Sequence, residues 1–227
     1  MALTLVPGFM LDRDLWTDIA PALGRFGPLI HADPARATTI AGMARDTLQA
    51  APARFGVIGF SMGGYVAREM ARGAPDRVSR LVLIATSARG DSELQARRRA
   101  VASTADTSAF RGIARRSIAQ SLAPEREEDE ALIGRIHAMS LRLGGETFRR
   151  QAMFRREGDL DRLSSITCPT LVVAGDRDRL RSIEEAEEMA AGIPGARLEI
   201  LPSGHMIPME APGPLAELLA DFLGEGM

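Results

Sequence analysis

The sequence predicts an α/β protein built on a doubly wound, mostly parallel sheet. Short apolar runs alternate with longer helical patterns along most of the 227 residues. Most of these runs are apolar at consecutive positions, which is typical of strands covered on both faces. A chain of this length can form one hydrophobic core without disulfides or metal ions.

Six runs rich in leucine and β-branched residues are predicted to be strands. They cover residues 3–6, 28–31, 55–59, 80–85, 170–174 and 197–201. Helical patterns lie between them, over residues 12–23, 39–50, 62–72, 183–191 and 214–223. Asp12, Thr39 and Ser182 stand at helix starts, where a side-chain oxygen accepts the free N–H groups of the first turn. Helices between strands predict crossover connections and therefore a parallel sheet.

Residues 90–163 interrupt this alternation. The segment is strongly charged and shows three or four amphipathic helices but no strand candidate. Its apolar positions recur at helical spacing and include Ile113, Ile118, Leu122, Leu132, Ile136 and Met139. We predict a core of residues 1–89 and 164–227 with a helical lid, 90–163, over the strand ends. A plain helical subdomain that thickens the core fits equally well, because pockets and cores are both apolar.

Composition and charge narrow the classes of partner. The 28 basic residues are all arginine, which excludes lysine Schiff-base chemistry, and 30 acidic residues leave a net charge of −2. This near-neutral balance argues against nucleic acid and anionic membranes as binding partners and favours a small, largely uncharged molecule. A single cysteine, Cys168, and the absence of a leader or of about 18 consecutive apolar residues predict a cytoplasmic protein. The sequence carries no indication of oligomeric state.

A serine stands at a predicted strand-to-helix turn, in the segment Gly59-Phe60-Ser61-Met62-Gly63-Gly64. This is the pattern of a nucleophile elbow, in which the neighbours two residues away on each side must be small for the strand and helix to approach closely. Glycine occupies both positions. The following helix also directs its N-terminal partial positive charge toward charge that develops on a substrate.

A serine hydroxyl needs a base, and the chain has three histidines. His31 lies in a predicted strand and His137 in the insertion, where it packs or lines the pocket. His205 lies in the loop after the last strand, the position of the base when nucleophile, acid and base follow one another along the chain. The third member is a carboxylate between serine and histidine, and both Asp176 and Asp178 follow the strand at 170–174.

These motifs resemble the α/β-hydrolase fold family, particularly its short bacterial serine hydrolases. The likeness extends from Leu3 to Leu223. In that family the acid comes three residues after the glycine that ends the strand, which implies Asp178, with Asp176 bracing the loop. The family's oxyanion donors map onto the backbone N–H groups of Phe9 and Met62, and its glutamate near the last helix maps onto Glu210 as a structural residue.

The chain also departs from the family pattern. Pro7 replaces a histidine that often precedes the oxyanion glycine, and the sheet is reduced to about six strands. Residues 179–182 replace a proline-containing turn with Arg-Leu-Arg-Ser. This change predicts either a displaced acid loop or an extra positive charge facing Asp178.

The sequence therefore predicts a serine hydrolase that cleaves a small carboxylic ester through an acyl-enzyme, with Ser61, His205 and Asp178 as the triad. The resemblance leaves lactone opening, thioester cleavage and carbon–carbon hydrolysis open on the same triad. A non-catalytic small-molecule binding protein is the alternative from another class. No cofactor or metal is expected, because neither ligand spacing nor a phosphate-binding loop is present, and Cys168 is predicted to be a small buried side chain.

Overall fold

The structure is a computed structural model that describes residues 1–104 and 106–225. Its strands are β1 (Ala2–Val6), β2 (Leu29–His31), β3 (Phe55–Phe60), β4 (Val78–Ile84), β5 (Thr170–Gly175) and β6 (Arg197–Leu201). All strand pairs are parallel, in the order β2-β1-β3-β4-β5-β6. The six predicted strands are confirmed, with ends displaced by at most two residues. The order reverses between β1 and β3, and such a switch point opens a crevice at the carboxyl ends of the two strands.

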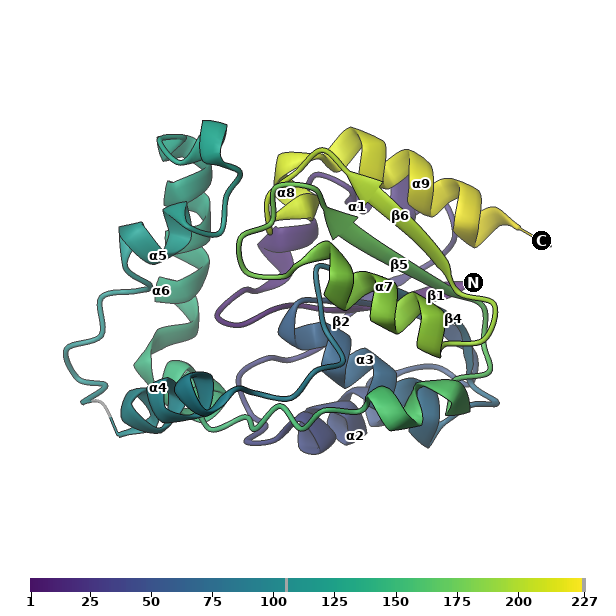
Figure 1. Ribbon diagram of the computed structural model, residues 1–227, viewed down its shortest axis with the longest axis horizontal. Coiled ribbons are helices and arrows are strands. Elements are labelled where there is room, and N and C mark those ends of the chain that lie inside the picture. Colours follow the sequence, from purple (N-terminus) through teal and green to yellow (C-terminus); the bar gives the residue numbers. More distant parts are fainter. Residues whose placement is uncertain (105, 226–227) are drawn as a thin grey trace.

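Helices cover both faces of the sheet (Figure 1). One face packs against α2 (Ile40–Ala50), α3 (Met62–Gly73) and α7 (Ile183–Gly192), and the other against η1 (Arg13–Trp16), α1 (Ala20–Leu23) and α9 (Pro212–Gly224). Successive residues of a strand therefore enter opposite cores: in β4, Leu81 and Leu83 face the first set of helices, and Val82 and Ile84 face the second. This two-sided burial explains the consecutive apolar residues of the strands.

The helix predicted over residues 12–23 is wrong as a single element. The chain forms the 3₁₀ helix η1, then a turn, and then the short helix α1. Pro21 lies in the first turn of α1, where its missing N–H is tolerated, whereas in a continuous helix it would remove a hydrogen bond and clash with the preceding turn. The predicted caps are confirmed: the side chains of Asp12, Thr39 and Ser182 accept first-turn N–H groups of η1, α2 and α7.

Residues 90–163 contain α4 (Glu93–Ser103), α5 (Arg115–Ala119), η2 (Pro124–Arg126) and α6 (Glu130–Ala152), and η3 (Leu160–Ser165) follows at their end. In Figure 1, α4, α5 and α6 stand together beyond one end of the sheet, and both chain termini lie toward the other end. The long helix α6 is interrupted at Gly144, where φ is 75°, a conformation that favours glycine. Ile118, Leu122, Ile136 and Met139 are buried and join the core formed by η1 and α9.

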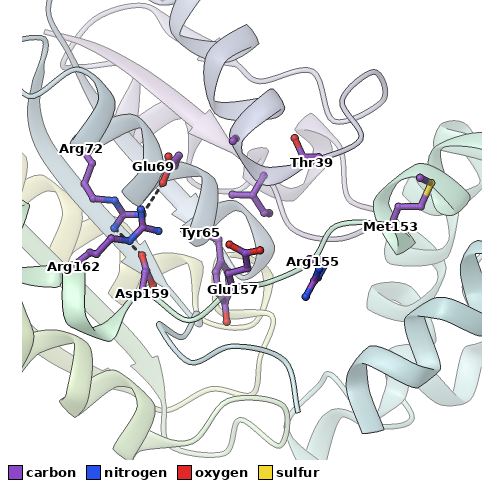
Figure 2. Close-up of a pocket in the computed structure, with 11 residues that line it drawn as sticks. Thr39, Tyr65, Glu69, Arg72, Met153, Arg155, Glu157, Asp159 and Arg162 are labelled. Atoms are coloured by element: carbon purple, nitrogen blue, oxygen red, sulfur yellow. Dashed lines mark hydrogen bonds and ion pairs between the residues drawn. The ribbon is translucent and has the colours of Figure 1, made fainter. Parts of the chain in front are cut away.

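A buried ion network fastens the end of this segment to α3. Arg68 is fully buried and donates from Nε and Nη2 to the two carboxylate oxygens of Asp159, both at 2.9 Å. Arg72 adds a bond of 2.7 Å to Asp159 and pairs with Glu69 at 2.8 Å. Figure 2 shows Arg72 between these two carboxylates in the wall of a cleft of about 420 Å³. Burial by itself raises the pKa of Asp159, but the two guanidinium groups lower it below its ordinary value.

Replacing Asp159 with asparagine is expected to lower the free energy of unfolding by about 3–5 kcal/mol, because Arg68 then keeps a buried charge without a counter-charge. Urea denaturation of wild type, Asp159→Asn and the control Glu69→Gln measures this effect. The lowered pKa means that the stabilisation is present at neutral pH and is lost as the pH falls below about 4, since the unfolded carboxyl has the higher pKa. Equal losses at pH 7 for both variants would contradict the assignment.

Candidate active site

Ser61 lies on the turn between β3 and α3, as the sequence predicts. Its backbone has φ 51° and ψ −114°, a strained conformation for a residue other than glycine. The turn is possible because its flanking residues are small. A Cβ atom on Gly63 would lie 2.2 Å from the carbonyl oxygen of Val6, and one on Gly59 would lie 2.5 Å from the carbonyl oxygen of Gly63.

Three hydrogen bonds to the backbone of Ser61 hold this strained residue in place. The Ser61 N–H donates to the Ile84 carbonyl at 2.9 Å. The Ser61 carbonyl accepts from the Gly64 N–H at 3.0 Å and from the Thr86 hydroxyl at 2.7 Å. The hydroxyl of Ser61 is thereby fixed at the carboxyl end of β3, beside the switch point of the sheet.

The structure brings Ser61, His205 and Asp178 into one hydrogen-bonded chain. His205 Nε2 lies 2.9 Å from Ser61 Oγ, and His205 Nδ1 lies 2.7 Å from Asp178 Oδ2. The Asp178 side chain is almost fully buried, and its Oδ1 accepts the N–H groups of Leu180 and Arg181 at 2.7 and 3.0 Å. A carboxylate only accepts hydrogen bonds, so Nδ1 carries the proton, and Nε2 is left to accept the serine proton.

The neighbouring carboxylate is placed differently. Asp176 is exposed, and its Oδ1 accepts the N–H of Ser203 and Nε of Arg177, both at 3.0 Å. The two arginines that follow Asp178 also turn away from it. Arg179 donates to the carbonyls of Ala119 and Leu122, both at 2.9 Å, and Arg181 pairs with Glu185 at 3.2 Å. Among the described side chains, only that of His205 forms a hydrogen bond with Asp178.

The loop that carries His205 is bonded to residues 90–163. The His205 N–H donates to the Ser121 carbonyl at 2.9 Å, and the imidazole packs against Phe60 with ring centroids 5.2 Å apart. Glu210, at the end of α8 (Ile207–Glu210), accepts from the N–H of Met206 at 2.9 Å and from the N–H of Ala123 at 2.7 Å. Glu210 therefore links the loop of Met206 to the loop of Ala123, and neither of these hydrogen bonds involves Ser61.

The loop after β1 faces Ser61 from the other side of the switch point. Within residues 1–104 and 106–225, the N–H groups of Phe9 and Met62 have no intramolecular acceptor. The adjacent Met10 has φ 55°, and its N–H donates to Gln151 Oε1 at 2.8 Å. Gln151 also donates to the Pro34 carbonyl at 2.9 Å, so this buried side chain fixes the loop from the end of α6.

Ser61 and His205 open into a cavity of about 480 Å³, a size suited to a small ligand. The wall near Ser61 is mainly apolar, and Phe148 of α6 packs edge-on against Phe9 with centroids 5.6 Å apart. Residues 90–163 contribute a large share of the lining, namely Gln95, Ile113, Ser117, Ile118, Ser121, Ile136, Phe148 and Arg156.

Comparison with known proteins identifies the family of the chain. The model of the "Alpha/beta hydrolase family" matches residues 5–218. The chain belongs to the α/β-hydrolase family. Among curated relatives of this α/β hydrolase, a poly(3-hydroxyalkanoate) depolymerase of Ectopseudomonas oleovorans is 30% identical over 175 residues, which are 74% of this chain and 60% of that protein. A putative carbamate hydrolase, RutD, of Azorhizobium caulinodans is 30% identical over 180 residues, 74% of this chain and 66% of that protein. The chain thus spans less than two thirds of either relative.

Solved structures resemble the α/β hydrolase over nearly its whole length. An esterase from Thermogutta terrifontis is 27% identical with a TM-score of 0.86, covering 99% of this chain and 90% of that one. An enol-lactonase from Burkholderia xenovorans LB400 is 23% identical with a TM-score of 0.84, covering 99% and 91%. The similarity to the enol-lactonase shows only that the two proteins share a fold.

Other residues considered from the sequence lie outside this cavity. His31 is exposed in a separate cleft beside Asp12 and Arg142, and His137 Nδ1 contacts the Ile113 carbonyl at 3.0 Å. Cys168 is buried, and burial raises the pKa of its thiol, which keeps it protonated.

Sequence reasoning missed the roles of Gln151, Phe148 and Arg156. All three belong to the charged, helical segment 90–163, where they look like ordinary surface or packing positions. The amphipathic pattern offered only a weak signal, because it identifies a buried face without saying what that face touches.

Proposed function

We propose that the α/β hydrolase cleaves a small carboxylic ester by acyl transfer to Ser61. His205 is the base, Asp178 orients it, and the N–H groups of Phe9 and Met62 stabilise the oxyanion. The observation that carries this proposal is the hydrogen-bonded chain from Asp178 through His205 to Ser61 at the edge of a cavity. The similarity to an esterase at 27% identity supports an ester as substrate.

The steps follow from the positions of these atoms. Ser61 Oγ attacks the ester carbonyl carbon, and its proton passes to His205 Nε2. The tetrahedral intermediate collapses, and the alkoxide leaves with the proton from His205. Water then attacks the acyl-enzyme while His205 takes its proton, which releases the carboxylic acid and restores Ser61. Each oxyanion donor contributes about 2.7–4 kcal/mol of transition-state stabilisation in measured cases.

The proposal includes a lid role for residues 90–163 over a core of residues 1–89 and 164–227. The insertion's contribution to the cavity lining supports it. A cytoplasmic location also belongs to the proposal and rests on the lone, unpaired cysteine. No helix in the described part of the chain is both long and apolar enough to cross a membrane.

Labelling with a small fluorophosphonate tests the proposal without a known substrate. Ser61 Oγ attacks phosphorus, fluoride leaves, and the hydroxyl proton passes to His205. Intact-mass analysis is expected to show one adduct on wild type and on Ser164→Ala, an exposed serine control, and none on Ser61→Ala or His205→Ala. An adduct that persists in Ser61→Ala would overturn the assignment.

Turnover of matched ester, lactone and thioester substrates then separates the reactions open to the same triad. We expect the ester to have the highest kcat/KM. Ligand binding without an adduct and without turnover would favour the non-catalytic binding protein instead.

A further inference from the structure

Two arginines line the same cavity as Ser61 and His205. Arg156 belongs to the extended stretch between α6 and η3, and Arg181 immediately precedes the cap of α7. The two arginines thus come from different segments of the chain, Arg156 from residues 90–163 and Arg181 from the loop of the proposed acid. The expectation of an uncharged substrate rested on net charge alone and did not include this local charge.

The carboxylates near these two arginines do not neutralise both of their positive charges. Arg181 pairs with Glu185, whose other carboxylate oxygen accepts the Ser182 N–H at 2.9 Å. Asp91 accepts the Arg156 backbone N–H at 3.0 Å and pairs with Arg99. Both nearby carboxylates are therefore committed to other groups.

Arg156 is the member left with no counter-charge. Among the side chains that the structure describes, no carboxylate lies within 4.0 Å of its guanidinium, and its buried Nε has no acceptor. The adjacent Glu157 is exposed and lines two outer clefts, one of which Arg156 also borders, but it does not line this cavity. Among the described side chains, Arg156 therefore has no carboxylate partner, and its guanidinium carbon lies 5.9 Å from the centroid of the Tyr65 ring.

A guanidinium group in this position is unfavourable unless it has a partner. Burial, followed by the positive charge of Arg181, lowers the pKa of Arg156 to about 10; Tyr65 opposes this shift, and the charge of Arg99 makes the smallest contribution. The group is still protonated at neutral pH. A buried charged donor without an acceptor lowers stability, and a bound anion would supply the missing partner.

We infer that Arg156 binds a carboxylate carried by the substrate, so that the α/β hydrolase acts on esters that bear one additional carboxylate group. This inference rests on the proposed function. A planar guanidinium matches a carboxylate through two parallel hydrogen bonds, and a single uncompensated charge matches a singly charged group. Arg181, whose charge is paired with Glu185, lines the same cavity, and the cavity of about 480 Å³ accommodates a short two-ended molecule.

Two isosteric substrate pairs test the inference. Monoethyl glutarate carries a carboxylate on the acyl side of the ester, and ethyl 5-methylhexanoate has an isopropyl group in its place. In the second pair, 4-acetoxybutanoate carries the carboxylate on the alcohol side, and 4-methylpentyl acetate has the isopropyl group. In at least one pair, wild type is expected to have a kcat/KM at least tenfold higher for the anionic member. Arg156→Met is expected to lower that ratio about ten- to hundredfold.

Arg155→Met is the matched control, because Arg155 is the exposed neighbour and lines only the outer clefts. The ratio of kcat/KM for the anionic substrate to kcat/KM for the neutral substrate is expected to stay within twofold of wild type in this variant. The Tm of Arg156→Met is expected to be unchanged or higher, since the variant removes an unpaired charge. A preference for the neutral member in both pairs, or an unchanged ratio in Arg156→Met, would overturn the inference.

A binding measurement separates this inference from the proposed function. Calorimetry on Ser61→Ala uses the amide analogues N-ethylglutaramate and 4-acetamidobutanoate, with N-ethyl-5-methylhexanamide as the neutral control. We expect at least one anionic amide to bind, and Ser61→Ala/Arg156→Met to bind it at least tenfold more weakly. Binding without a fluorophosphonate adduct on wild type would reject the proposed function alone. An adduct without anion binding would reject the inference alone.

Discussion

Replacing Ser61 with alanine is expected to lower kcat for ester hydrolysis by about 10⁶-fold, as measured when the serine of such a triad is removed. The reason is that the variant loses the only hydroxyl hydrogen-bonded to His205 among the described residues. Ser121 also lines the cavity, but its hydroxyl donates to the Ile118 carbonyl at 2.6 Å. The oxyanion donors are backbone groups and remain, so slow residual hydrolysis above the uncatalysed rate is expected.

Initial rates at saturating ester, together with the Tm of each protein, measure this effect. Alanine tolerates the backbone of Ser61 about as well as serine does, so the Tm is expected to stay close to that of wild type. Ser164→Ala controls for the loss of an exposed serine hydroxyl. Turnover by Ser61→Ala within tenfold of wild type would show that another group is the nucleophile.

Replacing Asp178 with asparagine is expected to lower kcat by about 10⁴-fold, the loss measured for the equivalent change in a characterised triad. The Leu180 and Arg181 N–H groups donate to Oδ1, so the amide oxygen of asparagine must take that position. Its NH₂ group then faces His205 Nδ1 and donates to it. The imidazole proton is displaced to Nε2, which can no longer accept the proton of Ser61.

Asp176→Asn is the matched control, because it lies two residues away and bonds to Ser203 and Arg177 instead. Its kcat is expected to remain within about threefold of wild type. Comparison of kcat for the two variants, with Tm measured in parallel, decides between the carboxylates. A large loss in Asp176→Asn with a small one in Asp178→Asn would make Asp176 the acid.

Local sequence patterns were sufficient for the elements and for the elbow. Consecutive apolar residues predicted strands buried on both faces because side chains alternate across a sheet, and helices cover both sides here. Gly59 and Gly63 flank Ser61 because a Cβ atom at either position would overlap backbone atoms. The one helix predicted wrongly, over residues 12–23, contains Pro21, whose effect on the backbone outweighed the apolar pattern.

The sequence alone therefore determined the fold class, the strands and the placement of Ser61 on a strained turn, because these depend on residues close together in the chain. Tertiary structure decided which carboxylate meets His205, since Asp176 and Asp178 share one loop and differ only in orientation. It also brought Gln151 to Met10 across 141 residues of chain and left the buried Nε of Arg156 without an acceptor among the described residues. Such contacts depend on how distant segments pack, and no local periodicity encodes them.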